Sequence, residues 1–393
     1  MTDDRYSPPT LSLLQLFLRF LGFGFLAFGG PVAQIAMVKQ ALVEEDRWIS
    51  PARFNRLLAV MQVLPGPEAH ELCVHLGMIA RGRIGGLLAG LGFMLPGFLL
   101  MLGAAWLYED WLVGNPAMAP AFLGVQVVVL AIIARAIQRI AAHILEDRLL
   151  WLLAAGAFAA TLSGTPFWIP LIASGLFYTY AARPAAVVAI CLAAVLLAAF
   201  MFNAGPSINT GDAASQVGVL ALFIAGLKGG LLTFGGAYTA IPYVRSDTVG
   251  RGWVTDASFL DGVAFAGMLP APLVIFATFA GYVAGGFSGA LAITAGMFLP
   301  AFAFSLIFFE RLEAIVENPK LHRALAGVAA AVVGVIAATL FQLAASTAER
   351  TTSPLPSLLL FGAALWIVWR WKGKLTAPAL ILAGGVAGWI MHL

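Results

Sequence analysis

Long apolar stretches alternate with short polar loops along almost the whole chain. A helix needs roughly 20 apolar residues to cross the hydrocarbon core of a bilayer. The pattern predicts an all-α polytopic membrane protein, because most stretches approach or exceed that length. The predicted helical segments are 11–38, 52–80, 84–108, 116–142, 149–163, 165–182, 184–202, 216–244, 257–283, 285–309, 321–346, 355–371 and 375–393.

The chain carries the same arrangement twice. Phe28-Gly29-Gly30-Pro31 is matched by Phe234-Gly235-Gly236 about 206 positions later, and Leu64-Pro65-Gly66-Pro67 is matched by Leu269-Pro270-Ala271-Pro272. Each block places helix-breaking Gly and Pro inside a long apolar run, which is typical of transporters built from internal repeats. Further matched positions are Trp48 and Trp253, Leu95-Pro96 and Leu299-Pro300, and the expected helix N-caps Ser50 and Thr255.

The duplication predicts a domain organisation of two membrane repeats. The expected parts are an N-terminal repeat (1–183), a connecting transmembrane helix (184–202), a polar linker (203–215) and a C-terminal repeat (216–393). An odd number of crossings before the second repeat would turn it upside down. Lys and Arg favour cytoplasmic loops, and the basic loops change place between the halves if the broken segments are re-entrant. We therefore predict inverted-topology repeats with broken, re-entrant helices. In the alternative, every segment spans the membrane fully.

Composition supports a membrane protein. Of 393 residues, 61% are hydrophobic and 10% are charged, whereas soluble domains carry about 25% charged residues. The mean hydropathy of +0.94 excludes a soluble protein. The net charge of +3 comes from loop Lys and Arg without a long basic run, so no nucleic-acid partner is expected. We expect a multi-pass protein of the cell membrane, with the lipid bilayer as its surroundings.

The repeated breaks predict an oxyanion site. A helix that begins inside the membrane exposes unpaired N–H groups and the positive end of its dipole, and both attract an anion. Proline suits the first turn of such a helix, and glycine allows close backbone approach. The alternative is that the breaks are packing kinks, which Gly and Pro often produce in membrane helices. The candidate substrate-binding residues at the breaks are Phe28, Gly29, Gly30, Pro31, Pro65, Gly66, Pro67, Phe234, Gly235, Gly236, Pro270 and Pro272.

Two basic residues are candidates for charge neutralisation near the breaks. Lys228 lies six residues before Phe234 inside an apolar run, where a lysine is costly unless it is paired or faces water. It is a candidate ligand for a divalent oxyanion, and the alternative is a side chain that snorkels to the interface. The matching position in the first half is Gly22. Arg19, one turn earlier, is the candidate to replace it.

The acidic segment after Pro67 has no counterpart after Pro272. Glu68, Glu71 and His75 fall near one helical stripe. Carboxylates at a helix N-terminus are stabilised by the dipole, and they would compete with an incoming anion for the same N–H groups. This conflict suggests the hypothesis that protonation of Glu68 or Glu71 accompanies anion binding. His70 and His75 are five residues apart, unlike the pair in HExxH, so we expect neither a metal site nor a cofactor.

Three segments resemble the signature segments of the chromate ion transporter family: RFLGFGFLAFGGPVAQIAMV (19–38), RWISPARFNRLLAVMQVLPGPEA (47–69) and LKGGLLTFGGAYTAIPYV (227–244). The resemblance implies a long, two-repeat chromate efflux protein, a secondary active transporter and not an enzyme. Family members usually carry a basic residue six positions before the FGG phenylalanine in both halves. Lys228 fits this pattern. Gly22 departs from it, as Ala271 departs from the LPGP pattern.

Several alternatives stay open at this point. Chromate and sulfate are tetrahedral dianions of similar size, which hydrogen-bonding sites separate poorly, so a sulfate or other oxyanion permease is one alternative. A passive anion channel is another. A membrane-embedded enzyme using Glu68, His70 and Glu71 lacks an evident nucleophile or metal. The sequence also leaves open the coupling ion, for which a proton is the leading candidate, the direction of flux, and the oligomeric state, for which a homodimer is one option.

Overall fold

The structure is a computed structural model that describes residues 8–61, 64–112, 115–203, 217–234, 236–308, 319–351, 353–371 and 373–393. All regular secondary structure within these ranges is helical, so the prediction of an all-α protein is confirmed. Among the described residues, four helical stretches are long and apolar enough to cross a membrane: Glu68–Leu112, Ala119–Ile144, Leu273–Ile307 and His322–Arg350.

The helices of the first half follow the predicted order. They are α1 (Leu13–Phe25), α2 (Gly30–Lys39) with its π-helical extension η1 (Gln40–Glu45), α3 (Pro51–Met61), α4 (Glu68–Leu107) with η2 (Tyr108–Leu112), α5 (Ala119–Ile144), α6 (Arg148–Leu162), α7 (Trp168–Tyr180) and α8 (Pro184–Asn203).

The second half repeats the beginning of this order. Its elements are α9 (Val219–Leu231), η3 (Ala237–Ala240), α10 (Ile241–Thr248), α11 (Asp256–Met268), η4 (Leu273–Ile275), α12 (Phe276–Ala303), η5 (Phe304–Phe308), α14 (Pro319–Arg350), α15 (Pro354–Arg370) and α16 (Thr376–Met391).

The helices α3 and α11 start at matching caps, as predicted. The backbone N–H of Arg53 donates to Ser50 Oγ at 3.3 Å, and that of Ser258 donates to Thr255 Oγ1 at 3.1 Å. These bonds satisfy one of the N–H groups that every helix start leaves without an intrahelical partner. The same local chemistry therefore begins the second broken segment in both repeats.

Each repeat contains a helical hairpin whose turn rests on a glycine. Helix α4 turns at Arg81 and Gly82, where Gly82 has φ 64° and ψ −162°, and α12 turns at Gly285 and Gly286, where Gly286 has φ 61° and ψ −153°. L-residues with a side chain rarely adopt such dihedrals, which explains the glycine at both turns. The matching hairpins confirm that the duplication extends to the backbone.

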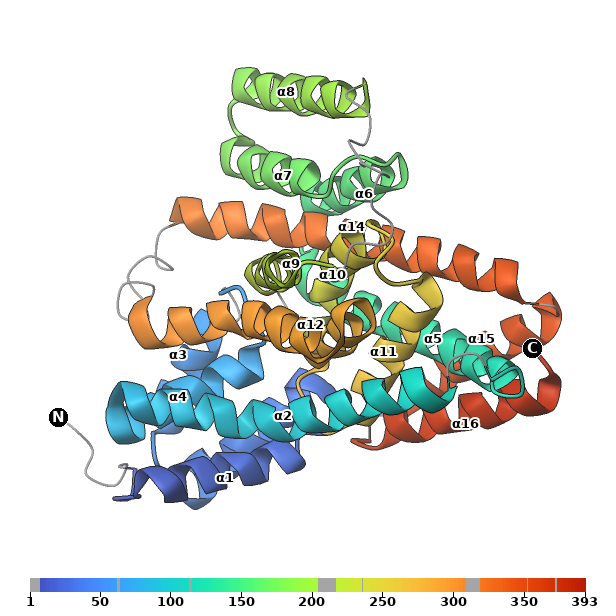
Figure 1. Cartoon of the computed structure of the whole chain (residues 1–393). Coiled ribbons are helices and arrows are strands. Elements are labelled where there is room, and N and C mark those ends of the chain that lie inside the picture. Colours follow the sequence, from blue (N-terminus) through green and yellow to red (C-terminus); the bar gives the residue numbers. More distant parts are fainter. Residues whose placement is uncertain are drawn as a thin grey trace.

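The first helix of each repeat packs closely on this hairpin. Figure 1 shows α1 (dark blue) alongside α4, and α9 packs on α12 in the same way. A Cβ added to Gly24 would lie 2.6 Å from the carbonyl oxygen of Phe93, and a Cβ added to Gly230 would clash with the carbonyl oxygen of Met297. In each repeat, a glycine thus lets the backbone of the first helix approach the backbone of the hairpin, and the two glycines occupy equivalent positions. The inversion of one repeat relative to the other across a membrane stays a prediction.

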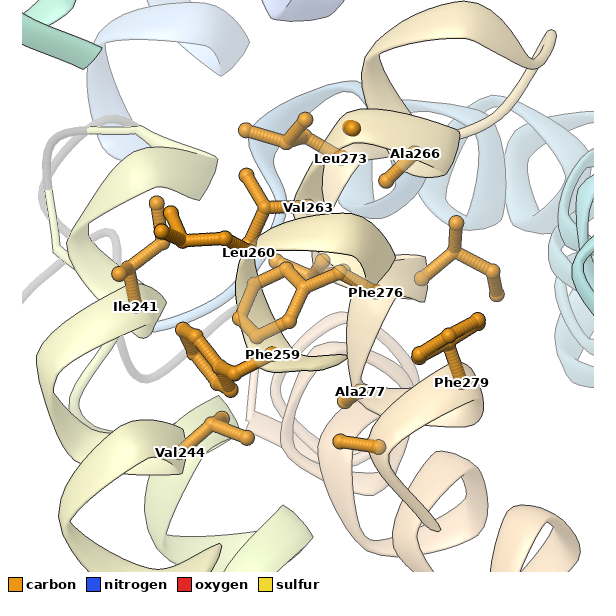
Figure 2. Close-up of a cluster of buried hydrophobic side chains, with 14 of the residues drawn as sticks. Ile241, Val244, Phe259, Leu260, Val263, Ala266, Leu273, Phe276, Ala277 and Phe279 are labelled. Atoms are coloured by element: carbon orange, nitrogen blue, oxygen red, sulfur yellow. The ribbon is translucent and has the colours of Figure 1, made fainter. Parts of the chain in front are cut away.

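The remaining helices surround these repeated units. Helices α15 and α16 (red) lie beside α5, while α8 packs on α7 at one end of the molecule (Figure 1). Side chains from α10, α11, η4 and α12 form a buried apolar cluster that supports the second-repeat breaks (Figure 2). The domain boundaries stay a prediction, and residues 204–215 of the expected linker lie outside the described residues.

Replacing Gly24 by valine is expected to lower the free energy of unfolding by about 2 kcal/mol, because the added carbons meet the α4 backbone, which cannot move aside. The measurement is the thermal unfolding temperature of the detergent-purified protein. The control is Gly22→Val, two residues earlier on α1, where an added Cβ meets nothing within 4 Å. Equal unfolding temperatures for the two variants would contradict the packing argument.

Candidate functional site

Both predicted breaks of the first repeat are present. Helix α1 ends at Phe25 and α2 begins at Gly30, with Gly29 at φ 85° and Gly30 at φ 77°. Helix α4 begins at Glu68, directly after Gly66 at φ 148° and Pro67. The glycines therefore occupy backbone conformations that other residues avoid, and the breaks are built into the sequence. Pro31 lies in the first turn of α2, as expected. Pro67 is instead the N-cap of α4, one residue before the first turn.

In the second repeat, the α-helices do not begin directly after the breaks. Helix α9 ends at Leu231 and α11 at Met268, so both interruptions are present. The chain then passes through the short 3₁₀ turns η3 and η4 before α10 and α12 begin. The two breaks of the second repeat are thus followed by 3₁₀ turns, whereas those of the first repeat are followed directly by α-helices. At η3, the hydroxyl and the backbone N–H of Thr239 both donate to the Gly236 carbonyl, which closes a tighter turn. Gly235 lies outside the described residues.

The breaks meet in pairs across the two repeats. The backbone N–H of Gly66 donates to the carbonyl of Thr233 at 2.8 Å, which joins the second break of the first repeat to the first break of the second repeat. At the equivalent pair, Ala27 and Ala271, the buried Gln34 amide bridges the two carbonyls at 2.8 and 2.9 Å. One contact is direct and the other is mediated by a side chain, but the same positions are joined.

Matching van der Waals contacts surround these bonds. A Cβ on Gly97 would clash with Ala271, and a Cβ on Gly66 would lie 3.3 Å from the Cβ of Ala301. Gly97 and Ala301 occupy equivalent positions, one residue after Pro96 and Pro300 respectively. Each hairpin thus packs against a break of the other repeat. The candidate site lies between the repeats, and residues of both contribute to it.

The start of α2 is the more open of the two α-helix starts. An added Cβ at Gly30 would meet nothing within 4 Å, and no side chain caps α2 among the described residues. The α4 start is more enclosed, because Gly66 and Pro67 are buried and the Gly66 N–H is already bonded. The loop before α16 places the backbone of Lys374 close to Gly29. The start of α2 therefore has free space beside Gly30, whereas the start of α4 has none beside Gly66.

The acidic residues of α4 lie directly at the enclosed break. Glu71 is fully buried, both its carboxyl oxygens lack a hydrogen-bond partner among the described residues, and the side chain lies against Gly66. Glu68 is partly buried in the same first turn, and His75 is buried one turn beyond Glu71. A buried carboxylate without a partner is costly unless it is protonated or meets a ligand. The neighbouring His70 is also fully buried, in edge-on contact with Phe298 and Phe302.

Both candidate basic residues form ion pairs. Arg19 pairs with Asp46 and lies over the ring of Trp48. Lys228, in the last turn of α9, pairs with Asp247 with an Nζ–Oδ1 distance of 3.2 Å. Each pair joins the first helix of a repeat to the segment that follows its first break. The structure therefore brings neither cation to a break as a free ligand, and it gives each an acidic partner that the sequence argument missed.

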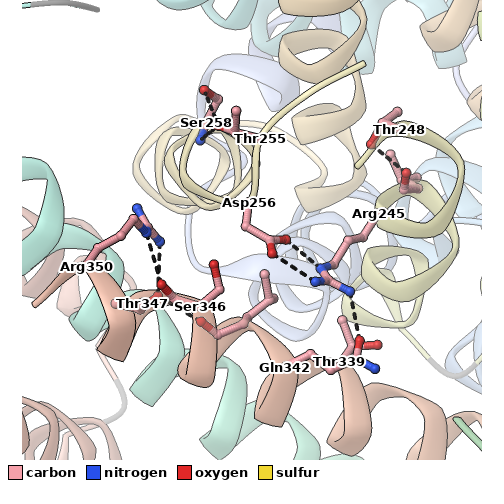
Figure 3. Close-up of polar contacts among 12 residues, drawn as sticks. Arg245, Thr248, Thr255, Asp256, Ser258, Thr339, Gln342, Ser346, Thr347 and Arg350 are labelled. Atoms are coloured by element: carbon pink, nitrogen blue, oxygen red, sulfur yellow. Dashed lines mark hydrogen bonds and ion pairs between the residues drawn. The ribbon is translucent and has the colours of Figure 1, made fainter. Parts of the chain in front are cut away.

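A second polar network holds α11 in place. Buried Asp261 accepts hydrogen bonds from Tyr108 Oη at 2.9 Å and Gln126 Nε2 at 2.8 Å, and Arg350 donates to Gln126 Oε1. Figure 3 shows a neighbouring cluster on α10, α11 and α14, in which Arg245 donates to Asp256 and to Gln342. Sequence reasoning missed these residues, although an aspartate inside an apolar segment was a signal for Asp261. The network holds α11, the helix that ends at Met268, two residues before Pro270.

Helix breaks that meet between two repeats of an apolar helical bundle are typical of membrane transporters. The chain belongs to the chromate transporter family, whose profile matches residues 14–180 and 220–389. The two matched regions correspond to the two repeats. The chain is therefore a two-repeat membrane protein of a family that transports chromate.

Two relatives support this assignment over nearly their full length. The chain is 57% identical over 389 residues to a chromate transport protein of Pseudomonas aeruginosa, covering 98% of this chain and 94% of the relative. It is 31% identical over 397 residues to a chromate transport protein of Cupriavidus metallidurans, covering 98% and 95%. No solved structure matches the chain.

Replacing Gln34 by glutamate is expected to destabilise the protein by about 3 kcal/mol, because a carboxyl group cannot donate to two carbonyls at once and a buried charge is costly. The readouts are thermal unfolding and chromate transport, and both should decrease. The matched control is Gln138→Glu on exposed α5 surface beside Arg135. Wild-type transport by the Gln34 variant would show that the Ala27–Ala271 bridge is dispensable.

Proposed function

We propose that this protein is a secondary active transporter that exports chromate from the cytoplasm across the cell membrane. The observation that carries the proposal is the pairing of the helix breaks between the repeats. The substrate is held near these breaks, by backbone N–H groups at the start of α2 and by the residues around Gly66 and Thr233. Family membership supports chromate as the substrate.

The chemistry of the breaks suits a tetrahedral dianion. Backbone N–H groups at a helix start attract negative charge without a formal positive charge. Irregular backbone at membrane depth is tolerated where protein or a watery cavity surrounds it, and the breaks here are joined in pairs across the two repeats. A site shared by two repeats can change its access when one repeat moves against the other. This favours a carrier over a passive channel, which needs no such moving interface.

We also propose that protons drive the export and that Glu71 carries the proton. Its two carboxyl oxygens are buried without partners in the described part of the chain, and they lie beside Gly66. An anion in the break would be repelled by a charged Glu71 and tolerated by a protonated one. Glu68, three residues earlier in the same first turn, is the second candidate. Binding of the anion and of the proton are therefore linked.

Expression of this protein in a chromate-sensitive bacterium is expected to lower intracellular chromium severalfold, because an exporter opposes chromate uptake. Gly66→Ala should restore chromium to the level of cells without the protein, since Gly66 has φ 148°, which residues with a side chain rarely adopt, and the added Cβ would also displace the Glu71 carboxyl group. Gly156→Ala, at a position where an added Cβ meets nothing within 4 Å, is the control for expression. Increased chromium in expressing cells would identify an inward permease instead.

The variant Glu71→Gln is expected to abolish the pH dependence of chromate transport in proteoliposomes, because glutamine resembles the protonated carboxyl and cannot release the proton. Comparison with Glu68→Gln shows which of the two carboxyl groups produces the pH dependence. Glu146→Gln, on an exposed loop, is the control. If Glu68→Gln, Glu71→Gln and the double variant all keep the wild-type pH profile, coupling through this turn is wrong.

A further inference from the structure

Three charged residues gather where α10 approaches the end of α9. Asp247 Oδ1 lies 3.2 Å from Lys228 Nζ and 3.2 Å from Arg251 Nη2, so a single carboxylate oxygen serves two cations. Lys228 comes from the last turn of α9, directly before the first break of the second repeat. Arg251 follows α10 and lies 5.0 Å from the ring centroid of Trp253. The cluster carries one net positive charge.

The burial of the three groups is unequal. The side chain of Asp247 is 9% exposed, whereas those of Lys228 and Arg251 are 43% and 48% exposed. The second oxygen of Asp247, Oδ2, is buried and has no hydrogen-bond partner among the described residues. The two cations are thus accessible to a ligand from outside. The Asp247 carboxylate that holds the two cations is buried, and one of its oxygens lacks a hydrogen-bond partner among the described residues. This is an unfavourable state for a carboxylate.

We propose that Lys228, Asp247 and Arg251 form a capture site for a divalent tetrahedral oxyanion, in which Asp247 holds the two cations until the anion displaces it. Lys228 and Arg251 share a single oxygen, Asp247 Oδ1, whereas a dianion would offer them several acceptor oxygens. Charge-assisted hydrogen bonds of this type are strong. Asp247 is then an internal competitor of the substrate. The inference rests on the proposed function, since it places a further substrate contact beside the same break.

The first repeat lacks this site. Arg19 pairs with Asp46 there and lies over Trp48, the equivalent of Trp253, so a guanidinium, an aspartate and an indole come together in both repeats. The position equivalent to Lys228 is Gly22, so the added lysine belongs to the second repeat alone. The first-repeat pair balances one positive charge with one negative charge and leaves no excess to attract an anion. Anion capture is therefore assigned to the second repeat.

The test is equilibrium binding of radiolabelled chromate to the purified full-length protein. Asp247→Asn is expected to bind chromate roughly tenfold more tightly than the wild type, because the two cations lose their internal competitor and the site loses a negative charge. Lys228→Gln should bind more weakly. A general loss of structure would weaken binding in both variants, so the opposite signs separate competition from damage.

Asp247→Glu keeps the charge and should bind like the wild type, while Asp110→Asn removes an exposed acidic group elsewhere and should have no effect. If the wild type binds chromate and Asp247→Asn binds it equally or less tightly, the capture site is wrong while the proposed function stands. If the wild type does not bind chromate, the proposed function itself fails.

A measurement on the wild type covers the case in which Asp247→Asn does not fold. Displacement by the anion frees the Asp247 carboxyl, so its modification by a hydrophobic carbodiimide, followed by peptide mass spectrometry, should increase severalfold when sulfate is added. Sulfate has the charge and shape of chromate without its oxidising power. Unchanged or reduced modification of Asp247 at saturating sulfate would overturn the proposal.

Discussion

The structure depends on one constraint, which is that backbone N–H and C=O groups exposed by an interrupted helix need partners inside an apolar environment. Here the two repeats supply partners to each other. Gly66 donates to Thr233, and Gln34 joins Ala27 to Ala271. A break in one repeat is thus completed by the other repeat. The duplication therefore has a physical role, because one repeat alone would deprive the Gly66 N–H and the Thr233 and Ala271 carbonyls of these partners.

Close backbone packing holds the interrupted segments in position. Glycines at matched places bring α1 onto α4 and α9 onto α12, while Gly82 and Gly286 turn the two hairpins. Without a hydrophobic driving force between helices in lipid, such contacts supply much of the association energy. The polar network around Asp261 adds a second constraint on α11. The breaks are consequently irregular backbone within a well-packed frame, which is what a selective site requires.

The two repeats share a backbone plan and differ in charge. The first repeat places Glu68 and Glu71 at its second break, where the second repeat has only apolar residues. The second repeat adds Lys228 to an arrangement of guanidinium, aspartate and indole that both repeats possess. Acidic groups thus lie at a break of one repeat and the excess cation lies in the other. Under the two proposals made above, this division would let one half respond to protons while the other attracts the anion.

The sequence by itself determined the helical class, the duplication, the position of each break and the N-caps at Ser50 and Thr255, because these follow from local hydrophobicity and from Gly and Pro dihedral preferences. It also indicated the acidic turn after Pro67. Only the tertiary structure decided which breaks meet, that Gln34 bridges two of them, and that Lys228 and Arg19 are held by Asp247 and Asp46. Those partners are distant along the chain, and local patterns contain no information about which distant groups the packing of helices brings together.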